Sequence, residues 1–505
     1  MSTVRTIVGF LFVLVVAAGA EPGRLGLVYE DLRFVPGVVE VTDVPVALGR
    51  PAADAVLRVD HSAEMPPVGN QGAQGSCVAW AHGYYQKTHT EFLEHRWNVA
   101  DPQNQMSPAF LYNQVNGGAD RGTGGSVVMK LMCEQGCASM ADCPYHDNDP
   151  VTWPSESAYD RGLVHRAGQS YWMYAGDTAG LSIVRQHIAN GYTCVLGIQV
   201  WSNFDNISMF RYTYCSSERY GTMRGWHAVT AVGYDDTLST SDGPGAFRMV
   251  NSWGTGWGDN GYFWMSYVAV MDAMMSGRQM EFASDRIGYE PHVVGRVTIS
   301  HATRDRVGIA FAVGTSECQL WRYDFRTWRT VHVDQPFPSH PMVFDLTDGE
   351  DYLHGGPGES LLVGCTDNQP EGTTGAITFF AGEHRPWNTR GVSMEVPVLI
   401  PDDGSEVYAR VHLAQTGQEE RSNVEFRMSN SATIARGVFS LPGLGHDPIS
   451  PSGNGSCPAL LDAAGRSVLA LHPGANDVSG LAPGVYFVRR AQAQAQAVSK
   501  LVVLR

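Results

Sequence analysis

A glycine-rich loop that turns into a helix at Cys77 constrains the fold more than any other stretch. Residues 67–81 read PVGNQGAQGSCVAWA. Apolar side chains then recur at the spacing of one helix face: Val78, Ala81 and Tyr85. Cys77 is therefore expected at a helix N-terminus, where unpaired N–H groups and the helix dipole favour a thiolate that attacks carbonyl carbon. Gln71, earlier in the loop, can aim its amide at an oxyanion beside Cys77.

Two later stretches carry residues that would complete a catalytic site around such a nucleophile. Residues 225–234, GWHAVTAVGY, alternate like a β-strand and carry His227 near their start. Residues 251–262, NSWGTGWGDNGY, follow another strand-like run and begin with Asn251. A histidine can take the thiol proton and later protonate the leaving amine, and an amide oxygen can hold its ring. Alone, Cys77 would more often be a buried structural cysteine, but these stretches favour the nucleophile.

The three stretches resemble the papain family of cysteine peptidases, in a form similar to its bacterial members. The resemblance implies that Cys77 is the nucleophile, His227 the general base and acid, and Asn251 the residue that orients the imidazole. It also implies that Gln71 and the Cys77 backbone N–H donate to the oxyanion, and that Trp253 shields the histidine from water. The implied reaction is hydrolysis of peptide bonds through a thioester, with no cofactor and no metal.

The match departs from the family beside the nucleophile. Gln74 stands where the family often has a disulfide cysteine, and Val78 stands where it often has tryptophan. Neither change removes a catalytic group, so activity is expected. The resemblance assigns Gly124 and Gly125 to the wall that substrate backbone approaches; the alternative is a plain turn leading into a helix.

The predicted fold class is an α+β papain-like two-lobed catalytic domain followed by β-sandwich domains. A length of 505 residues suits about three domains. Short strands between turn clusters predict a jelly-roll-like sandwich: residues 293–300, 307–313, 319–323, 342–346, 360–363 and 376–381. The predicted boundaries are a signal peptide at 1–20, an N-terminal arm or short propeptide at 21–60, the peptidase domain at 61–288, the sandwich at 289–395, a linker at 396–424 and an immunoglobulin-like domain at 425–505.

The two ends of the chain predict export. Residues 1–20 combine Arg5, an apolar run and a small-residue cleavage site, which is typical of a secretory signal peptide; an uncleaved anchor is the less favoured alternative. Residues 461–468, 478–489 and 500–505 resemble the sorting domain of the type IX secretion system. That resemblance implies secretion machinery as a partner and a secreted or cell-surface location in a Gram-negative-type bacterium, and an ordinary immunoglobulin-like tail is the alternative.

The net charge, the apolar runs and the cysteines give further expectations about partners, membrane spans and disulfides. A net charge of −16 argues against nucleic acid as a partner, and no second apolar run is long enough to span a membrane. Connectivity of the nine cysteines cannot be read from sequence. Two disulfides are hypothesised because each pair lies within one predicted domain: Cys194 with Cys215, and Cys318 with Cys365.

The combined interpretation is a secreted cysteine endopeptidase that acts on proteins or peptides. Its main rival is a cell-surface adhesion or glycan-binding protein whose papain-like domain is inactive. A transferase or amidase using the same thioester is a second rival. An exopeptidase would need a segment that blocks one end of the cleft.

Overall fold

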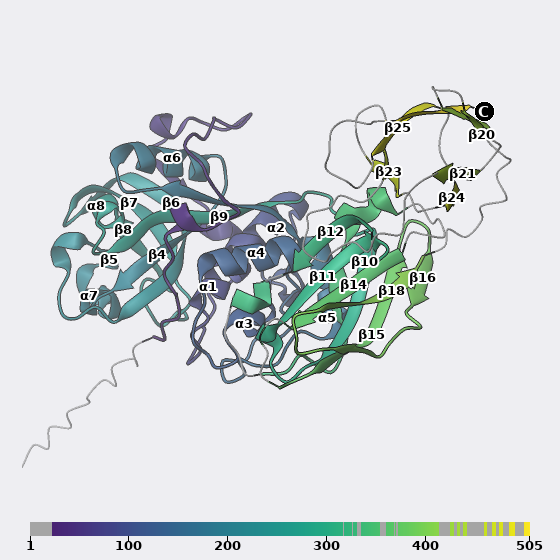
Figure 1. Ribbon diagram of the computed structural model, residues 1–505. Coiled ribbons are helices and arrows are strands. Elements are labelled where there is room, and N and C mark those ends of the chain that lie inside the picture. Colours follow the sequence, from purple (N-terminus) through teal and green to yellow (C-terminus); the bar gives the residue numbers. More distant parts are fainter. Residues whose placement is uncertain are drawn as a thin grey trace, which may run out of the picture.

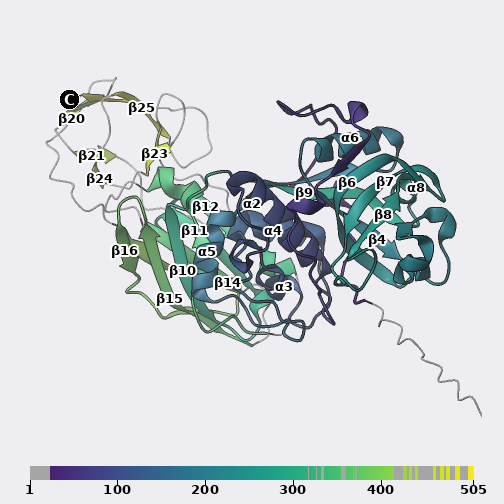
Figure 2. The same cartoon turned by 180° about the vertical axis from the view of Figure 1, so that it is seen from behind.

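The computed structural model describes residues 23–413 except 317, 326, 331–334, 354–359, 368, 370 and 371, and beyond them the strands β19–β26. The predicted signal peptide at 1–20 lies outside the described residues. Figure 1 shows the peptidase domain in purple to teal beside a green sandwich, and Figure 2 shows the same arrangement from behind. Among the described residues, no helix is both long and apolar enough to cross a membrane.

A single buried helix of mixed winding runs through the first lobe. It begins as α1 (Cys77–Ala79), widens into a π-helical stretch (Trp80–Lys87) and continues as α2 (Thr88–His95). Its residues are buried on all sides as far as Glu91, as expected of a helix enclosed in a large core. The other helices of this lobe are α3 (Pro108–Val115), α4 (Gly125–Gln135) and α5 (Glu156–Gly162).

The start of α3 follows from local chemistry. Ser107 is the N-cap of α3, and its Oγ accepts a hydrogen bond from the Phe110 N–H at 3.2 Å. Pro108 occupies the first turn, where its missing N–H costs nothing.

The second lobe is a nine-stranded sheet in the order β1-β3-β9-β4-β6-β7-β8-β5, with β2 paired to β6. Its strands are β1 (Val38–Glu40), β2 (Arg58–Asp60), β3 (Ala167–Tyr174), β4 (Cys194–Val200), β5 (Thr213–Tyr214), β6 (Gly225–Thr240), β7 (Gly243–Val250), β8 (Tyr262–Ser266) and β9 (Ser276–Asp285). Three helices flank it: α6 (Thr178–Ala189), α7 (Ser202–Asp205) and α8 (Tyr267–Met271). In the antiparallel β6–β7 pair, Thr230 lies opposite Val250, so the end of β7 lies beside the start of β6.

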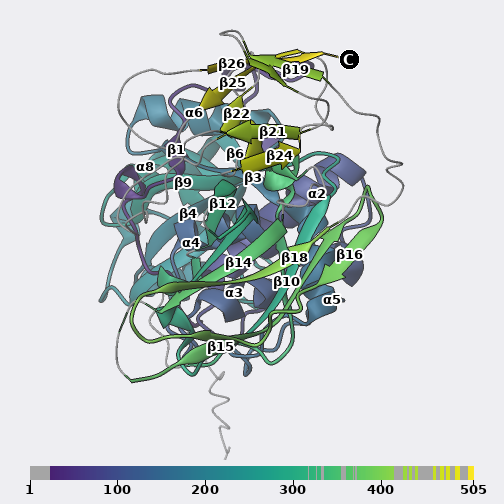
Figure 3. The same cartoon turned by 45° about the vertical axis from the view of Figure 1, so that its right-hand side comes forward.

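The predicted sandwich is present as two four-stranded layers with one added strand (Figure 3). One layer has the order β13-β10-β15-β16, with β17 on β15, and the other has the order β12-β11-β14-β18. The bounds are β10 (Val293–Ser300), β11 (Val307–Gly314), β12 (Gln319–Phe325), β13 (Met342–Asp345), β14 (Ser360–Asp367), β15 (Gly375–His384), β16 (Thr389–Val392), β17 (Val398–Ile400) and β18 (Glu406–His412). All six predicted strands are confirmed, with ends shifted by a few residues.

The sandwich continues into the stretch predicted as a linker at 396–424. β17 pairs with β15, and β18 pairs with β14 along seven residues. β18 buries Ala409 and Val411, so it completes the core of its layer. The two strands cover sheet edges that would otherwise be exposed.

The hypothesised disulfides are wrong. Cys194 and Cys215 are free thiols; Cys194 lies in β4 and Cys215 follows β5, which three strands separate from β4. Cys365 is also a free thiol, on β14, two strand positions from β12, which Cys318 precedes. Two strand spacings are about 9.6 Å, which exceeds the roughly 7 Å that a disulfide can bridge between Cα atoms.

Beyond residue 413 the described strands form two further sheets, β20-β19-β26-β25-β22-β23 and β21-β24. Their bounds are β19 (Glu425–Met428), β20 (Ala432–Ile434), β21 (Val438–Leu441), β22 (Ala459–Leu461), β23 (Ser467–Ala470), β24 (Gly474–Asp477), β25 (Gly484–Arg489) and β26 (Ser499–Leu504). The last strand pairs with both β19 and β25, so it lies inside its sheet.

The first lobe and the sandwich share one buried core. Trp153 of the lobe packs on Trp328 of the sandwich with ring centroids 4.6 Å apart. Nearby, Arg166 Nη1 lies 2.5 Å from Asp345 Oδ2, and the Tyr289 hydroxyl donates to the same oxygen. Both charged side chains are almost fully buried, so the two units are expected to unfold together.

Replacing Arg166 with alanine is expected to cost about 3–5 kcal/mol of unfolding free energy, because Asp345 would remain buried without its cation. Arg410→Ala is the matched control, since its partner Glu395 lies in a half-exposed pair worth at most about 1 kcal/mol. Urea unfolding measures both. Equal losses would show that the interface pair contributes no more than a surface pair.

Candidate active site

His227 and Asn251 meet where β6 begins and β7 ends. The His227 Nε2–H donates to Asn251 Oδ1 at 2.7 Å, and both side chains are fully buried. Because an amide oxygen only accepts, this bond places the neutral ring's proton on Nε2 and leaves a lone pair on Nδ1. Nδ1 has no hydrogen-bond partner among the described residues. It is therefore available to accept a proton.

Cys77 lies on the other wall of the same site. It is the first residue of α1, as predicted, and the backbone N–H of Ala228, the residue after His227, reaches its thiol. The nucleophile and the base are therefore carried by adjacent parts of the two lobes.

Aromatic rings cover the imidazole. The Trp253 ring lies 4.8 Å from the His227 ring, centroid to centroid. Phe204 and Trp257 pack on Trp253 at 5.2 and 5.4 Å. This aromatic cover lies beside the His227–Asn251 hydrogen bond, and shielding of that bond from water by Trp253 stays a prediction.

Gln71 is held with its amide N–H groups toward the cleft. Its Oε1 accepts from the Ser252 hydroxyl at 2.7 Å, and its backbone N–H donates to the Ser252 carbonyl at 2.8 Å. Its Nε2 donates to the carbonyl of Gln74 at 2.9 Å and to that of Arg24 at 3.1 Å. Sequence reasoning did not identify Ser252 as the residue that orients this amide.

The N-terminal arm itself occupies the cleft. Its Gly26 carbonyl accepts from the Thr123 N–H, and its Val28 N–H donates to the Thr123 carbonyl, each at 2.9 Å. The backbone N–H of Gly26 also reaches the Cys77 thiol. In Figure 1 this purple segment passes between the teal lobe and the blue helices.

Side chains of the arm fit the walls of the cleft. A Cβ at Gly197 would lie 2.7 Å from a methyl carbon of Leu27, so the glycine makes room for the leucine. Tyr29 stacks on Trp226 with ring centroids 4.2 Å apart. The Glu30 carboxylate accepts from the N–H and hydroxyl of Ser126 at 3.2 and 2.8 Å.

The backbone of the arm contacts Thr123. Thr123 directly precedes Gly124 and Gly125, the two glycines expected to form the wall that substrate backbone approaches. Gly124 is the N-cap of α4, and a Cβ there would lie 2.2 Å from a Glu30 carboxylate oxygen. A Cβ at Gly125 would lie 1.8 Å from a Glu281 carboxylate oxygen. Carboxylate groups of Glu30 and Glu281 therefore lie against the two glycines, whereas the backbone of the arm lies against Thr123.

Burial favours the neutral forms of Cys77 and His227. It raises the pKa of the Cys77 thiol to about 11, although backbone N–H groups act in the opposite direction. It lowers the pKa of His227 to about 4, against the effect of the Asn251 hydrogen bond. Thiolate and imidazolium are each disfavoured between these values, so the site is in a resting form at neutral pH.

Comparisons with known proteins match the first half of the chain to one family. The family described as "Papain family cysteine protease" matches residues 54–280. An uncharacterised peptidase C1-like protein of Acanthamoeba polyphaga mimivirus is 26% identical over 216 residues, which cover 40% of this chain and 65% of that protein. "Cathepsin B-like CP2" of Giardia intestinalis is 27% identical over 215 residues, covering 41% and 67%. The crystal structure of xylellain, a cysteine protease from Xylella fastidiosa, covers 53% of this chain and 98% of its own, with 21% identity and a TM-score of 0.41.

The chain therefore contains a papain-like cysteine peptidase domain. It spans about two thirds of the length of the curated relatives named above.

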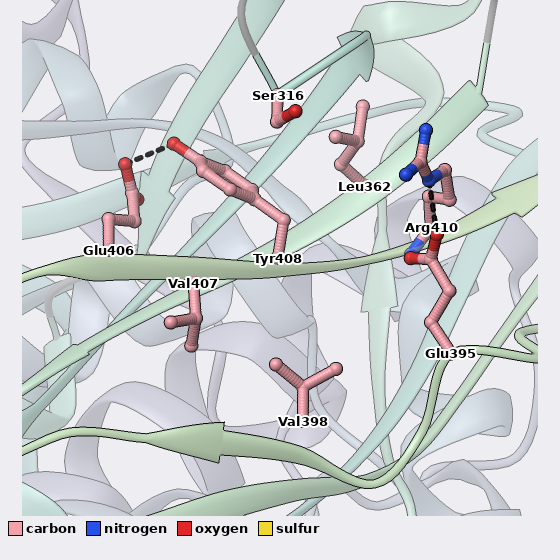
Figure 4. A pocket seen from close by; sticks show the side chains of 8 residues that line it. All are labelled: Ser316, Leu362, Glu395, Val398, Glu406, Val407, Tyr408 and Arg410. Carbon is pink, nitrogen blue, oxygen red and sulfur yellow. Dashed lines mark hydrogen bonds and ion pairs between the residues drawn. The ribbon is translucent and has the colours of Figure 1, made fainter.

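A separate hollow of about 320 Å³ lies on the sandwich (Figure 4). Its lining residues are Ser316, Leu362, Glu395, Val398, Glu406, Val407, Tyr408 and Arg410. The charged groups are already paired, Arg410 with Glu395, and Glu406 with the Tyr408 hydroxyl and with Arg322 at 2.8 Å. The hollow therefore presents no unpaired charge toward a ligand.

Replacing Asn251 with alanine is expected to lower kcat/KM about 100-fold in a chain whose cleft has been freed, because the imidazole loses its anchor. The Asn251 bond raises the pKa of His227, so its loss should also move the alkaline limb of the pH–rate profile to lower pH. Asn113→Ala is the control, since Asn113 is equally buried but bonds only to the carbonyls of Asp149 and Thr152. An unchanged profile in the Asn251 variant would contradict the orienting role.

Proposed function

We propose that this protein is an exported papain-type endopeptidase whose own residues 23–30 hold it in a latent state. The observation that carries the proposal is the His227–Asn251 pair, with the free Nδ1 lone pair beside the Cys77 helix start. Gln71 adds an amide donor on the same side of the cleft.

The groups present account for each step of peptide hydrolysis. His227 Nδ1 takes the thiol proton, and Cys77 Sγ attacks the carbonyl carbon. The resulting oxyanion takes hydrogen bonds from Gln71 Nε2 and the Cys77 backbone N–H. The imidazolium, held by Asn251, protonates the leaving amine, and water activated by His227 then hydrolyses the thioester.

Latency follows from the contacts of the arm. The Arg24 carbonyl takes the Gln71 hydrogen bond that an oxyanion would take, and Gly26 lies at the thiol. The arm leaves the cleft through an exposed turn at residues 34–37, where the Phe34 side chain is 78% exposed. A cut in this turn would leave residues 23–33 held only by non-covalent contacts.

The path of the arm favours an endopeptidase over an exopeptidase. On one side of Cys77, the Gly23 carbonyl accepts from Arg224 at 2.8 Å. On the other side, Leu27 and Tyr29 pack on the cleft walls. A continuous backbone therefore fits on both sides of the nucleophile. The contact of Leu27 with Gly197 suits a substrate with a leucine-sized apolar side chain at this place.

Export and surface delivery complete the proposal. The signal-like residues 1–20 would direct the chain across the inner membrane. The strands of residues 425–505 end in an inner strand with a basic C-terminal residue, in keeping with a sorting domain that secretion machinery recognises. Protein or peptide substrates would then be met outside the cell.

Mapping the products of a denatured protein substrate by mass spectrometry tests the activity. Internal cuts that the Cys77→Ala chain does not make are the expected result. Trimming from one end would indicate an exopeptidase. No cleavage after release of the arm would favour the adhesion or glycan-binding alternative.

A further inference from the structure

Three side chains that the proposed reaction does not use converge beside the catalytic helix. His61 follows β2, Glu64 ends a short 3-10 helix (Ser62–Glu64), and His89 lies in α2. Their nearest nitrogen and oxygen atoms all lie within 4.8 Å of one another. His61 is 8% exposed and His89 is fully buried, while Glu64 is half-buried.

The hydrogen bond from His61 to Ile188 leaves two acceptors facing each other, a ring nitrogen of His61 and the carboxylate of Glu64. His61 Nε2 lies 2.9 Å from the Ile188 carbonyl, which can only accept, so Nε2 carries the hydrogen. Nδ1 of the neutral ring then holds a lone pair, and it lies 3.2 Å from Glu64 Oε2. A lone pair and a carboxylate oxygen at this distance repel each other unless a cation lies between them.

His89 approaches the same carboxylate oxygen. Its Nε2 is 3.2 Å from Glu64 Oε2, while its Nδ1 is buried with no partner among the described residues. The three side chains thus bring two imidazole nitrogens and one carboxylate oxygen together, and these are ligand types that transition metal ions bind.

We propose that His61 Nδ1, Glu64 Oε2 and His89 Nε2 bind a divalent transition metal ion, with Zn²⁺ as the best match. Nitrogen and carboxylate ligands bind Zn²⁺ at about 2.0–2.2 Å, so tetrahedral ligands lie roughly 3.4 Å apart, close to the separations from Glu64 to each histidine. The Ile188 carbonyl on the second nitrogen of His61 is the outer partner that ligating histidines usually have. Water reaches the half-exposed Glu64 and takes the fourth position.

A second cluster, formed by Glu91, Glu94 and His95, fits a metal less well. The Glu91 carboxylate already contacts Lys87 Nζ at 2.6 Å and His165 Nδ1 at 2.8 Å. The His95 side chain is 43% exposed. The charge of the Glu91 carboxylate is therefore already balanced by Lys87.

The place of the proposed site gives it a structural role. His61 and Glu64 directly precede the loop that carries Gln71, and His89 lies on the helix that begins at Cys77. A bound ion would join this loop to this helix, and through Ile188 it would also reach α6. It would stabilise the geometry between oxyanion donor and nucleophile without touching substrate.

Cobalt(II) titration of the full chain carrying Cys77→Ala, reduced and stripped with a chelator, tests the proposal independently of peptidase activity. We expect one Co²⁺ per chain, a visible spectrum typical of tetrahedral nitrogen and oxygen ligands, competition by Zn²⁺ and a melting temperature that rises with metal. His89→Gln should weaken binding by about 100-fold or more. Glu64→Gln, at a half-exposed position that folding tolerates, should do the same.

His95→Gln is the matched control and should bind Co²⁺ like the parent. Loss of binding in this variant would move the site to the second cluster. A thiolate-to-cobalt charge-transfer band would place the metal on cysteine. Either result, or no binding by the folded parent, would overturn the assignment.

Discussion

Replacing Cys77 with alanine is expected to lower kcat/KM by about 10⁵-fold or more in a chain whose cleft is free, since loss of a nucleophile removes the covalent path and leaves only binding and the oxyanion donors. The measurement is hydrolysis of a fluorogenic peptide with leucine-sized side chains. The unfolding temperature of the Cys77→Ala chain should stay close to that of the parent, because the substitution removes one small buried group.

Cys194→Ala is the matched control. Cys194 is a buried free thiol in β4, outside the catalytic site, so its loss should leave kcat/KM unchanged. Activity that survives in the Cys77 variant would mean that another residue is the nucleophile.

Replacing Leu27 with aspartate is expected to raise the activity of the full chain at least about 100-fold. Leu27 is half-buried and packs over Gly197 within the cleft, and placing a carboxylate in this apolar contact without a partner should cost about 3 kcal/mol of arm docking. That free energy corresponds to a factor of roughly 100 in the population of the open cleft. Initial rates on the fluorogenic peptide measure the effect.

Val28→Asp separates docking from charge. Val28 is the next residue of the same arm but is 53% exposed, so its side chain should tolerate a carboxylate. A synthetic peptide of residues 23–33 should inhibit the Leu27→Asp chain again. Equal activation by both substitutions would contradict the docking account, because charge alone would then release the arm.

Local patterns predicted the parts of the site whose signals lie within one short stretch. The helix start at Cys77, the strand carrying His227 and the turn that begins at Asn251 each follow from residue types at fixed spacing. The arm in the cleft could not be predicted in this way. Its main contacts join backbone groups of Gly26 and Thr123, and any residue except proline carries the same backbone groups.

The protonation states of the site residues also could not be predicted from the sequence. A helix N-terminus favours the thiolate, yet burial of the thiol acts more strongly and raises the pKa of Cys77. The His61–Glu64–His89 cluster is hidden for a related reason, since its members lie on separate elements and only tertiary packing brings them together. The boundary between sandwich and linker depends on tertiary packing in the same way, because β17 and β18 join the sandwich through their pairing with β15 and β14.

The most direct test of a papain-type site held closed by its own arm is the rate at which an epoxysuccinyl inhibitor alkylates Cys77, followed by peptide mapping. We expect an adduct on Cys77 that forms slowly in the intact chain and at least about 100-fold faster in the Leu27→Asp chain. An adduct that forms equally fast in both chains would show that the arm does not close the cleft. Absence of any adduct on Cys77 in either chain would contradict the catalytic assignment itself.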